Sequence, residues 1–141
     1  MGALDVSGLP ENALLLVDAA PIIYRLEQHP IFAQRFAPVF DLHRAGRVRF
    51  AITTITIAEV LAGPFKSGDE ELARRYRAVL ESWRVLDLDA ALAEEAARLR
   101  ARLRLKLPDA IQAASALAIN ADALVTHDRD FRGLSALRVI S

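Results

Sequence analysis

The chain has 141 residues, of which 53% are apolar and 26% are charged, and its formal net charge is zero. This length and composition predict one globular domain and exclude a disordered chain. The absence of cysteine and of a long apolar stretch excludes a disulfide scaffold, a thiolate zinc site and a membrane-spanning protein, so a cytoplasmic location with no membrane contact is expected.

The first strand is expected directly after a short N-terminal extension. Residues 1–12 lack the basic region and long apolar core of a signal peptide, and we interpret them as an extension to a single domain at 13–141. Ala13–Val17 is a continuous apolar run, which is typical of a central strand in a parallel sheet. Asp18 follows at the carboxyl end of this predicted strand.

The rest of the chain alternates between helical and strand patterns. Helices are predicted at 19–28, at 31–44 with Pro38 as a point of splitting or bending, before a stop at Gly63-Pro64, at 69–82, at 90–105 after Asp89 as N-cap, and from Pro108 onward. Further strands are predicted at 48–53, 83–88, 124–126 and, at an edge, 137–140. Strands separated by helices predict a parallel sheet with helices on both faces.

Four acidic residues fall at one edge of this predicted sheet. They follow strands or open helices at positions Asp18, Glu59, Asp109 and Asp128. Ligands of open α/β sheets bind beyond the carboxyl ends of the strands. Four carboxylates gathered there would repel one another unless a cation were present, and hard oxygen ligands suit Mg²⁺ or Mn²⁺.

Each acid also has a purely structural interpretation. Asp18 can cap the helix that follows it, and Thr56 with Glu59 matches a capping box. Asp109 suits the positive end of a helix, and Asp128 suits a turn. These interpretations explain the acids singly, but they do not explain why all four share one sheet edge.

Other kinds of site find no support in the sequence. The three histidines show no metal-binding spacing, no glycine-rich loop is suited to phosphates, and no G-x-S-x-G motif indicates a serine hydrolase. The acidic residues therefore remain the main candidates for chemistry.

The order of the motifs resembles that of PIN domains. The motifs are Asp18, the T-x-x-T-x-x-E pattern of Thr53, Thr56 and Glu59, the PDA of Pro108 to Ala110, and THDRDF from Thr126 to Phe131. The phrase LPDAIQAASA also resembles the VapC toxins of bacterial toxin–antitoxin pairs. The resemblance extends from Leu14 to Ile140, and it implies a three-layer α/β/α fold with a central, mainly parallel sheet of four to five strands.

What the resemblance implies is an Mg²⁺- or Mn²⁺-dependent endoribonuclease. Asp18 and Asp109 would be its main metal ligands, with Glu59 and Asp128 completing the shell or orienting water, and with Thr126 adding a hydroxyl. It also implies an RNA substrate, a homodimer and inhibition by a small VapB-like antitoxin.

Two features of the sequence leave alternatives open. Relatives often carry Thr or Ser directly after the first acid, whereas Ala19 stands here, and Asp130 is a rival to Asp128 for the fourth acidic position. The alternatives to a toxin are a catalytically weak PIN-fold interaction module, a housekeeping RNA-processing nuclease, and a metal-dependent phosphoesterase with another substrate.

Overall fold

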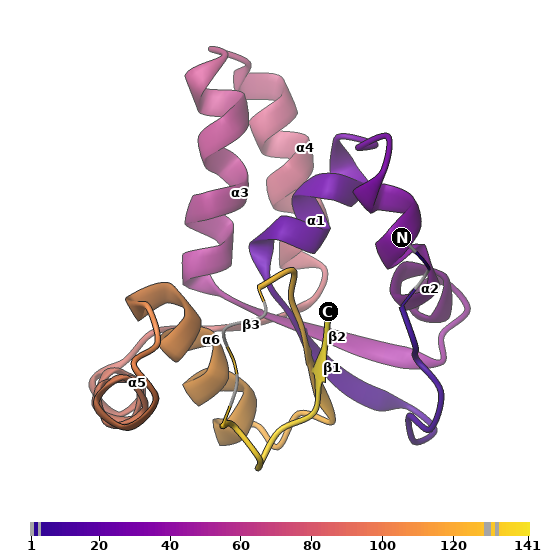
Figure 1. Ribbon diagram of the computed structural model, residues 1–141. Coiled ribbons are helices and arrows are strands. Elements are labelled where there is room, and N and C mark those ends of the chain that lie inside the picture. Colours follow the sequence, from indigo (N-terminus) through magenta and orange to yellow (C-terminus); the bar gives the residue numbers. More distant parts are fainter. Residues whose placement is uncertain (1, 3, 129–130, 132) are drawn as a thin grey trace.

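The protein is built on one sheet of five parallel strands. The computed structural model describes residues 2, 4–128, 131 and 133–141. Figure 1 shows the sheet, whose strands lie in the order β3-β2-β1-β4-β5. The strands are β1 (Ala13–Val17), β2 (Val48–Thr53), β3 (Arg84–Leu86), β4 (Ala123–Val125) and β5 (Val139–Ile140). The predicted α/β class and parallel pairing are confirmed, and the last strand lies at an edge as predicted.

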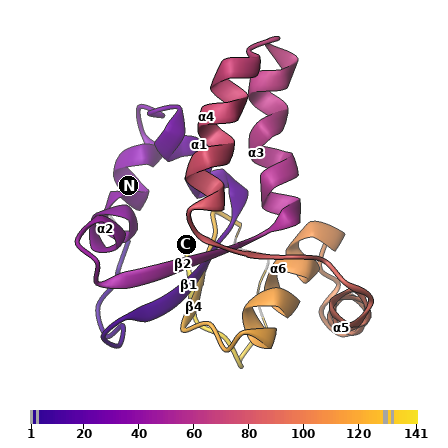
Figure 2. The ribbon, with the colours of Figure 1, turned by 180° about the vertical axis from the view of Figure 1, so that it is seen from behind.

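Among the described residues, six helices cover the two faces of the sheet (Figures 1 and 2). The helices are α1 (Ala19–Leu26), α2 (Phe32–Arg44), α3 (Thr54–Lys66), α4 (Glu70–Glu81), α5 (Ala90–Leu103) and α6 (Leu107–Ala118). Leu15 and Val17 of β1 pack in one core with α1 to α4, whereas Leu14 and Leu16 pack in a second core with α5 and α6. Because successive side chains of a strand point to opposite faces, the apolar run of β1 supplies both cores. In the described part of the chain, no helix is long and apolar enough to cross a membrane.

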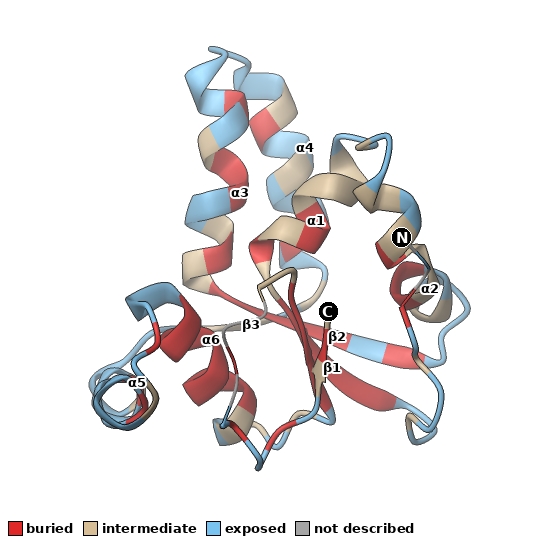
Figure 3. Ribbon diagram, viewed as in Figure 1, coloured by how far each residue is buried: buried red, intermediate tan, exposed pale blue. Residues whose placement is uncertain are grey.

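The expected helix stop at Gly63-Pro64 is wrong, because α3 continues to Lys66. A glycine ends a helix when it adopts a left-handed conformation, and Gly63 does not have a positive φ angle. The left-handed glycine is Gly68, with a φ of 71°, at the turn between α3 and α4. These two helices contact each other as a hairpin whose outer end is largely exposed (Figure 3).

Smaller differences concern the ends of elements. Pro38 does not split α2, which runs as one helix through the proline. The third and fifth strands are shorter than predicted. The helix α5 ends before Arg104, which has a left-handed φ of 56°. These are boundary effects that leave the topology unchanged.

The N-terminal extension packs against the domain. Leu4 is buried at 7% exposure and its N–H donates to the carbonyl oxygen of Arg35 on α2 at 3.2 Å. The guanidinium of Arg35 in turn donates to the carbonyl oxygens of Gly2, at 2.8 Å, and Ser141, at 2.7 Å. The Arg35 side chain therefore forms hydrogen bonds with residues near both ends of the chain.

Candidate active site

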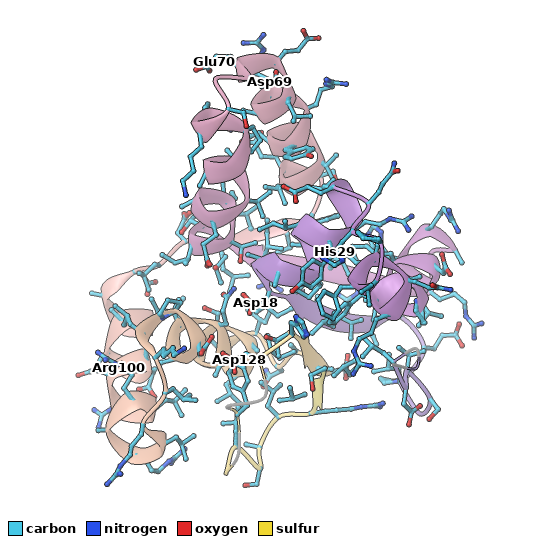
Figure 4. The ribbon with its side chains drawn as sticks, turned by 45° about the horizontal axis from the view of Figure 1, so that its top comes forward. Asp18, His29, Asp69, Glu70, Arg100 and Asp128 are labelled. Carbon is cyan, nitrogen blue, oxygen red and sulfur yellow. The ribbon has the colours of Figure 1, made fainter. Side chains whose placement is uncertain are left out.

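The strand register brings the candidate residues to the carboxyl edge of the sheet. Val17 pairs with Val125, so the residues that follow β1 and β4 are neighbours, and the Asp18 N–H donates to the Val125 carbonyl oxygen at 2.8 Å. The helix α6 precedes β4 and runs back along the sheet, which places its first turn, with Asp109, at the same edge. Figure 4 shows Asp18 and Asp128 near each other at the centre of the molecule.

Asp18 is held by three hydrogen bonds. Its Oδ1 accepts from the Ala19 N–H at 2.8 Å and from the Gln112 side-chain amide at 2.9 Å, and its Oδ2 accepts from the Thr126 hydroxyl at 2.9 Å. The residue is the N-cap of α1, as its structural interpretation predicted. The capping hydrogen bond therefore holds this carboxylate at the sheet edge, and the capping role is compatible with a role in the site.

Thr126 connects two of the acids. Its buried hydroxyl donates to Asp18 and accepts from the Asp128 N–H at 3.0 Å, which closes a turn just after β4. The same loop is linked to α1, because the Tyr24 hydroxyl and His127 Nδ1 share a hydrogen bond of 2.6 Å. Position 19 carries no hydroxyl, but Thr126 places one directly on the Asp18 carboxylate.

Asp109 is a buried acid in an electronegative setting. The residue is 8% exposed, and its Oδ2 is buried without a hydrogen-bond partner. Burial, followed by hydrogen bonding to Asp128 and the negative charges of Asp128 and Asp18, raises the pKa of Asp109 to about 7, while Lys106 opposes the shift. Such a carboxyl binds a proton near neutral pH when no cation neutralises the group.

This shift predicts how the stability of the metal-free protein depends on pH. In the folded protein the Asp109 carboxyl has a pKa of about 7, whereas in the unfolded chain its pKa has the ordinary value of 3.8. Between these values the native state holds more protons, so the free energy of unfolding should fall as pH rises from about 4 to about 7. Urea unfolding in the presence of EDTA across this pH range checks the prediction. If Asp109 instead made the free energy of unfolding increase with pH, the prediction would be contradicted.

Glu59 interacts electrostatically with Asp18. The capping-box interpretation is wrong, because the N-cap of α3 is Thr53, whose hydroxyl oxygen accepts from the Thr56 N–H at 3.3 Å. Glu59 lies further along the helix and is exposed. Partial desolvation and the negative charge of Asp18 raise the pKa of Glu59. The glutamate therefore has no capping role, and its carboxylate is available at the rim of the site.

Gln112 was not predicted from the sequence. It lies three residues after Asp109 on α6, is completely buried, and donates from Nε2 to Asp18 and to the Thr56 hydroxyl oxygen. A polar residue at this helical spacing from Asp109, within a run of alanines, is a signal that could have identified it.

The donor set suits a divalent cation, although the described carboxylates do not already surround one point. Within the described residues, no three His, Asp or Glu side chains are close enough to hold a single metal ion. Asp109 Oδ2 is nevertheless buried and unpartnered, and the interacting acids provide hard oxygen ligands. Mutual repulsion favours separated carboxylates when no cation is present. Asp130, the rival for the fourth position, lies outside the described residues.

Comparisons with known proteins agree on one family. A family model described as PIN domain matches residues 15–137. The structure is similar to that of a toxin–antitoxin complex from Klebsiella pneumoniae, with 27% identity, a TM-score of 0.71, and coverage of 90% of this chain and 96% of that chain. No curated protein sequence gives a match.

Two further structures share the fold at lower identity. VapBC2 from Rickettsia felis, bound to a DNA fragment from its promoter, has 23% identity and a TM-score of 0.69, with 89% and 96% of the two chains covered. VapC20 from Mycobacterium tuberculosis, described as a toxin that cleaves the sarcin–ricin loop, has 17% identity and a TM-score of 0.68, with 86% and 95% covered.

Proposed function

Because this chain belongs to the PIN domain family, we propose that it is a metal-dependent endoribonuclease of the VapC type, the toxin of a toxin–antitoxin pair. The observation that carries the proposal is the group of interacting carboxylates, Asp18, Asp109 and Asp128, at the carboxyl edge of the sheet. A fully buried carboxylate oxygen without a partner is costly in a purely structural role. It is useful where a cation is to be bound.

In this proposal, Asp18 and Asp109 are the main ligands of Mg²⁺ or Mn²⁺. When bound, the cation lowers the pKa of an attacking water and neutralises the charge that develops on the phosphate. Thr126 and Gln112 hold the Asp18 carboxylate in place by donating hydrogen bonds. Asp128 and Glu59 complete the acidic group, where a carboxylate can orient the attacking water and accept its proton.

The proposed partners are an RNA substrate, a VapB-like antitoxin and a second copy of this chain, all in the cytoplasm. Similarity to a toxin–antitoxin complex over 90% of the chain supports the antitoxin. The hydroxyl that Thr126 places on Asp18 favours an active enzyme over a catalytically weak interaction module, because position 19 is not the only source of a hydroxyl at this acid.

The test is cleavage by the purified chain. RNA should be cut internally in Mg²⁺ or Mn²⁺ and left intact in EDTA, and adding the product of a small adjacent reading frame should suppress cleavage. Activity on small phosphoesters but not on RNA would indicate a different phosphoesterase. A stable complex with the small partner, without any RNA cleavage, would instead indicate the interaction module.

A further inference from the structure

Gln112 stands at the junction of three elements that form the site. It is 0% exposed in the middle of α6, and its side-chain amide contacts residues from two other parts of the sheet edge. Nε2 donates to Asp18 Oδ1 at 2.9 Å and to Thr56 Oγ1 at 2.8 Å, and Oε1 accepts from Thr53 Oγ1 at 2.9 Å. The amide thus joins the end of β1, the end of β2 and the first turn of α3 through α6.

The chemistry of the partners fixes the direction in which this amide points. Thr53 Oγ1 already accepts from the Thr56 N–H, so its own proton is free to be donated to Gln112 Oε1. An ionised Asp18 can only accept, so it requires the N–H face of the amide. A flipped amide would set Oε1 against the Asp18 carboxylate, so that two acceptors would face each other. The hydrogen-bond network therefore permits one orientation.

Counting acceptor positions shows what the amide does for Asp18. A carboxylate offers about four lone-pair sites, two on each oxygen. The Ala19 N–H and Gln112 use both sites of Oδ1, whereas Thr126 uses one site of Oδ2. The remaining acceptor site is on Oδ2. The Thr126 hydroxyl that donates to this oxygen also accepts the hydrogen bond from the Asp128 N–H.

We propose that Gln112 is the positioning residue of this site, which saturates Oδ1 of Asp18 and thereby leaves Oδ2 as its metal-binding oxygen. The inference rests on the proposed function, and it assigns a role to a residue outside the acidic group. A hydrocarbon side chain could occupy the same space between small residues of α6, but it could not fix the carboxylate. Losing an outer contact to a metal ligand typically lowers metal affinity or activity by about 10- to 100-fold.

The test compares Gln112→Met with Ser115→Ala. The first change keeps the length of the side chain but removes its donors and acceptor. Ser115 lies one turn further along α6 and is also buried, at 1% exposure. Its replacement by alanine removes a hydroxyl that has no hydrogen-bond partner. Binding of Mn²⁺ is measured by calorimetry, and thermal melting is measured in EDTA. We expect the Mn²⁺ dissociation constant to rise about 10- to 100-fold in Gln112→Met and to stay within about twofold in Ser115→Ala.

A purely structural role would give another result. Gln112→Met would then melt at a lower temperature while its folded fraction bound Mn²⁺ with unchanged affinity, and this outcome would overturn the inference. Absence of Mn²⁺ binding by the unaltered chain would overturn the proposed metal site, and the inference with it. The two failures are therefore distinguishable by the behaviour of the unaltered chain.

A second variant keeps the test decisive if Gln112→Met does not fold. Gln112→Glu places a carboxyl at the position that contacts Asp18 Oδ1, and two carboxyl groups at this distance share a proton. Binding of Mn²⁺ must then displace that proton. Calorimetry in buffers of different ionisation enthalpy should show greater proton release than in the unaltered chain. Equal proton release would show that position 112 does not act on Asp18.

Discussion

Replacing Asp109 with asparagine is expected to abolish RNA cleavage while stabilising the metal-free protein at pH 8. Cleavage should fall by more than about 100-fold, beyond the loss typical of an outer-shell change, because a direct carboxylate ligand is removed. The free energy of unfolding should rise by an amount on the order of 2 kcal/mol, because each unit of pKa shift corresponds to about 1.4 kcal/mol and relaxation around the neighbouring acids reduces the full effect. A gain in stability with a loss of activity is the mark of a functional acid.

Cleavage time courses in saturating Mg²⁺, together with urea unfolding in EDTA, measure both effects of Asp109→Asn. Asp87→Asn is the matched control, since Asp87 is an exposed acid just after β3 and makes the same change of charge. We expect this control to change neither quantity appreciably. Unchanged cleavage in Asp109→Asn would refute the proposed mechanism.

Asp128→Asn should also remove most of the cleavage activity, whereas Asp130→Asn should retain it. Asp128 contributes to the raised pKa of Asp109, and its backbone N–H donates to the Thr126 hydroxyl oxygen. Asparagine cannot accept a proton from water, so a loss of about 100-fold or more is expected for a general base. The two variants make the same chemical change two residues apart, which makes each a control for the other.

Cleavage assays at several pH values distinguish the two acids further. If Asp128 acts as the base, Asp128→Asn should flatten the acidic limb of the pH–rate profile, and Asp130→Asn should leave the limb in place. Loss of activity in Asp130→Asn, with normal activity in Asp128→Asn, would assign the fourth position to Asp130.

The sheet and most of the helices were predictable because their patterns are local. The apolar run of β1 and the β-branched residues of β2 are confirmed as strands, and Asp89 caps α5 with its side chain as predicted. The stop at Gly63-Pro64 was wrong because glycine ends a helix only through its backbone conformation, which composition does not determine. Here the conformation that ends the segment belongs to Gly68.

The placement of the candidate acids was predictable, but the groups that hold them were not. Asp18 and Asp109 lie at one edge of the sheet because parallel strands and the helices between them bring particular chain positions to that edge. The role of Gln112 depends on a contact with Asp18, 94 residues away in sequence. The spacing of Gln112 from Asp109 indicates a shared face of the helix, but no periodicity in the sequence indicates the contact with Asp18. The capping role assigned to Glu59 failed because the N-cap of α3 is Thr53, about one turn before the predicted N-cap Thr56.

A crystal grown with Mn²⁺ should show whether these acids bind a divalent cation at the carboxyl edge of the sheet. We expect an anomalous difference peak about 2 Å from oxygens of Asp18 and Asp109, the distance at which hard cations of this size bind carboxylates. The peak should be absent from crystals of Asp109→Asn. A well-ordered site without a peak, in a protein that still cleaves RNA, would contradict the account.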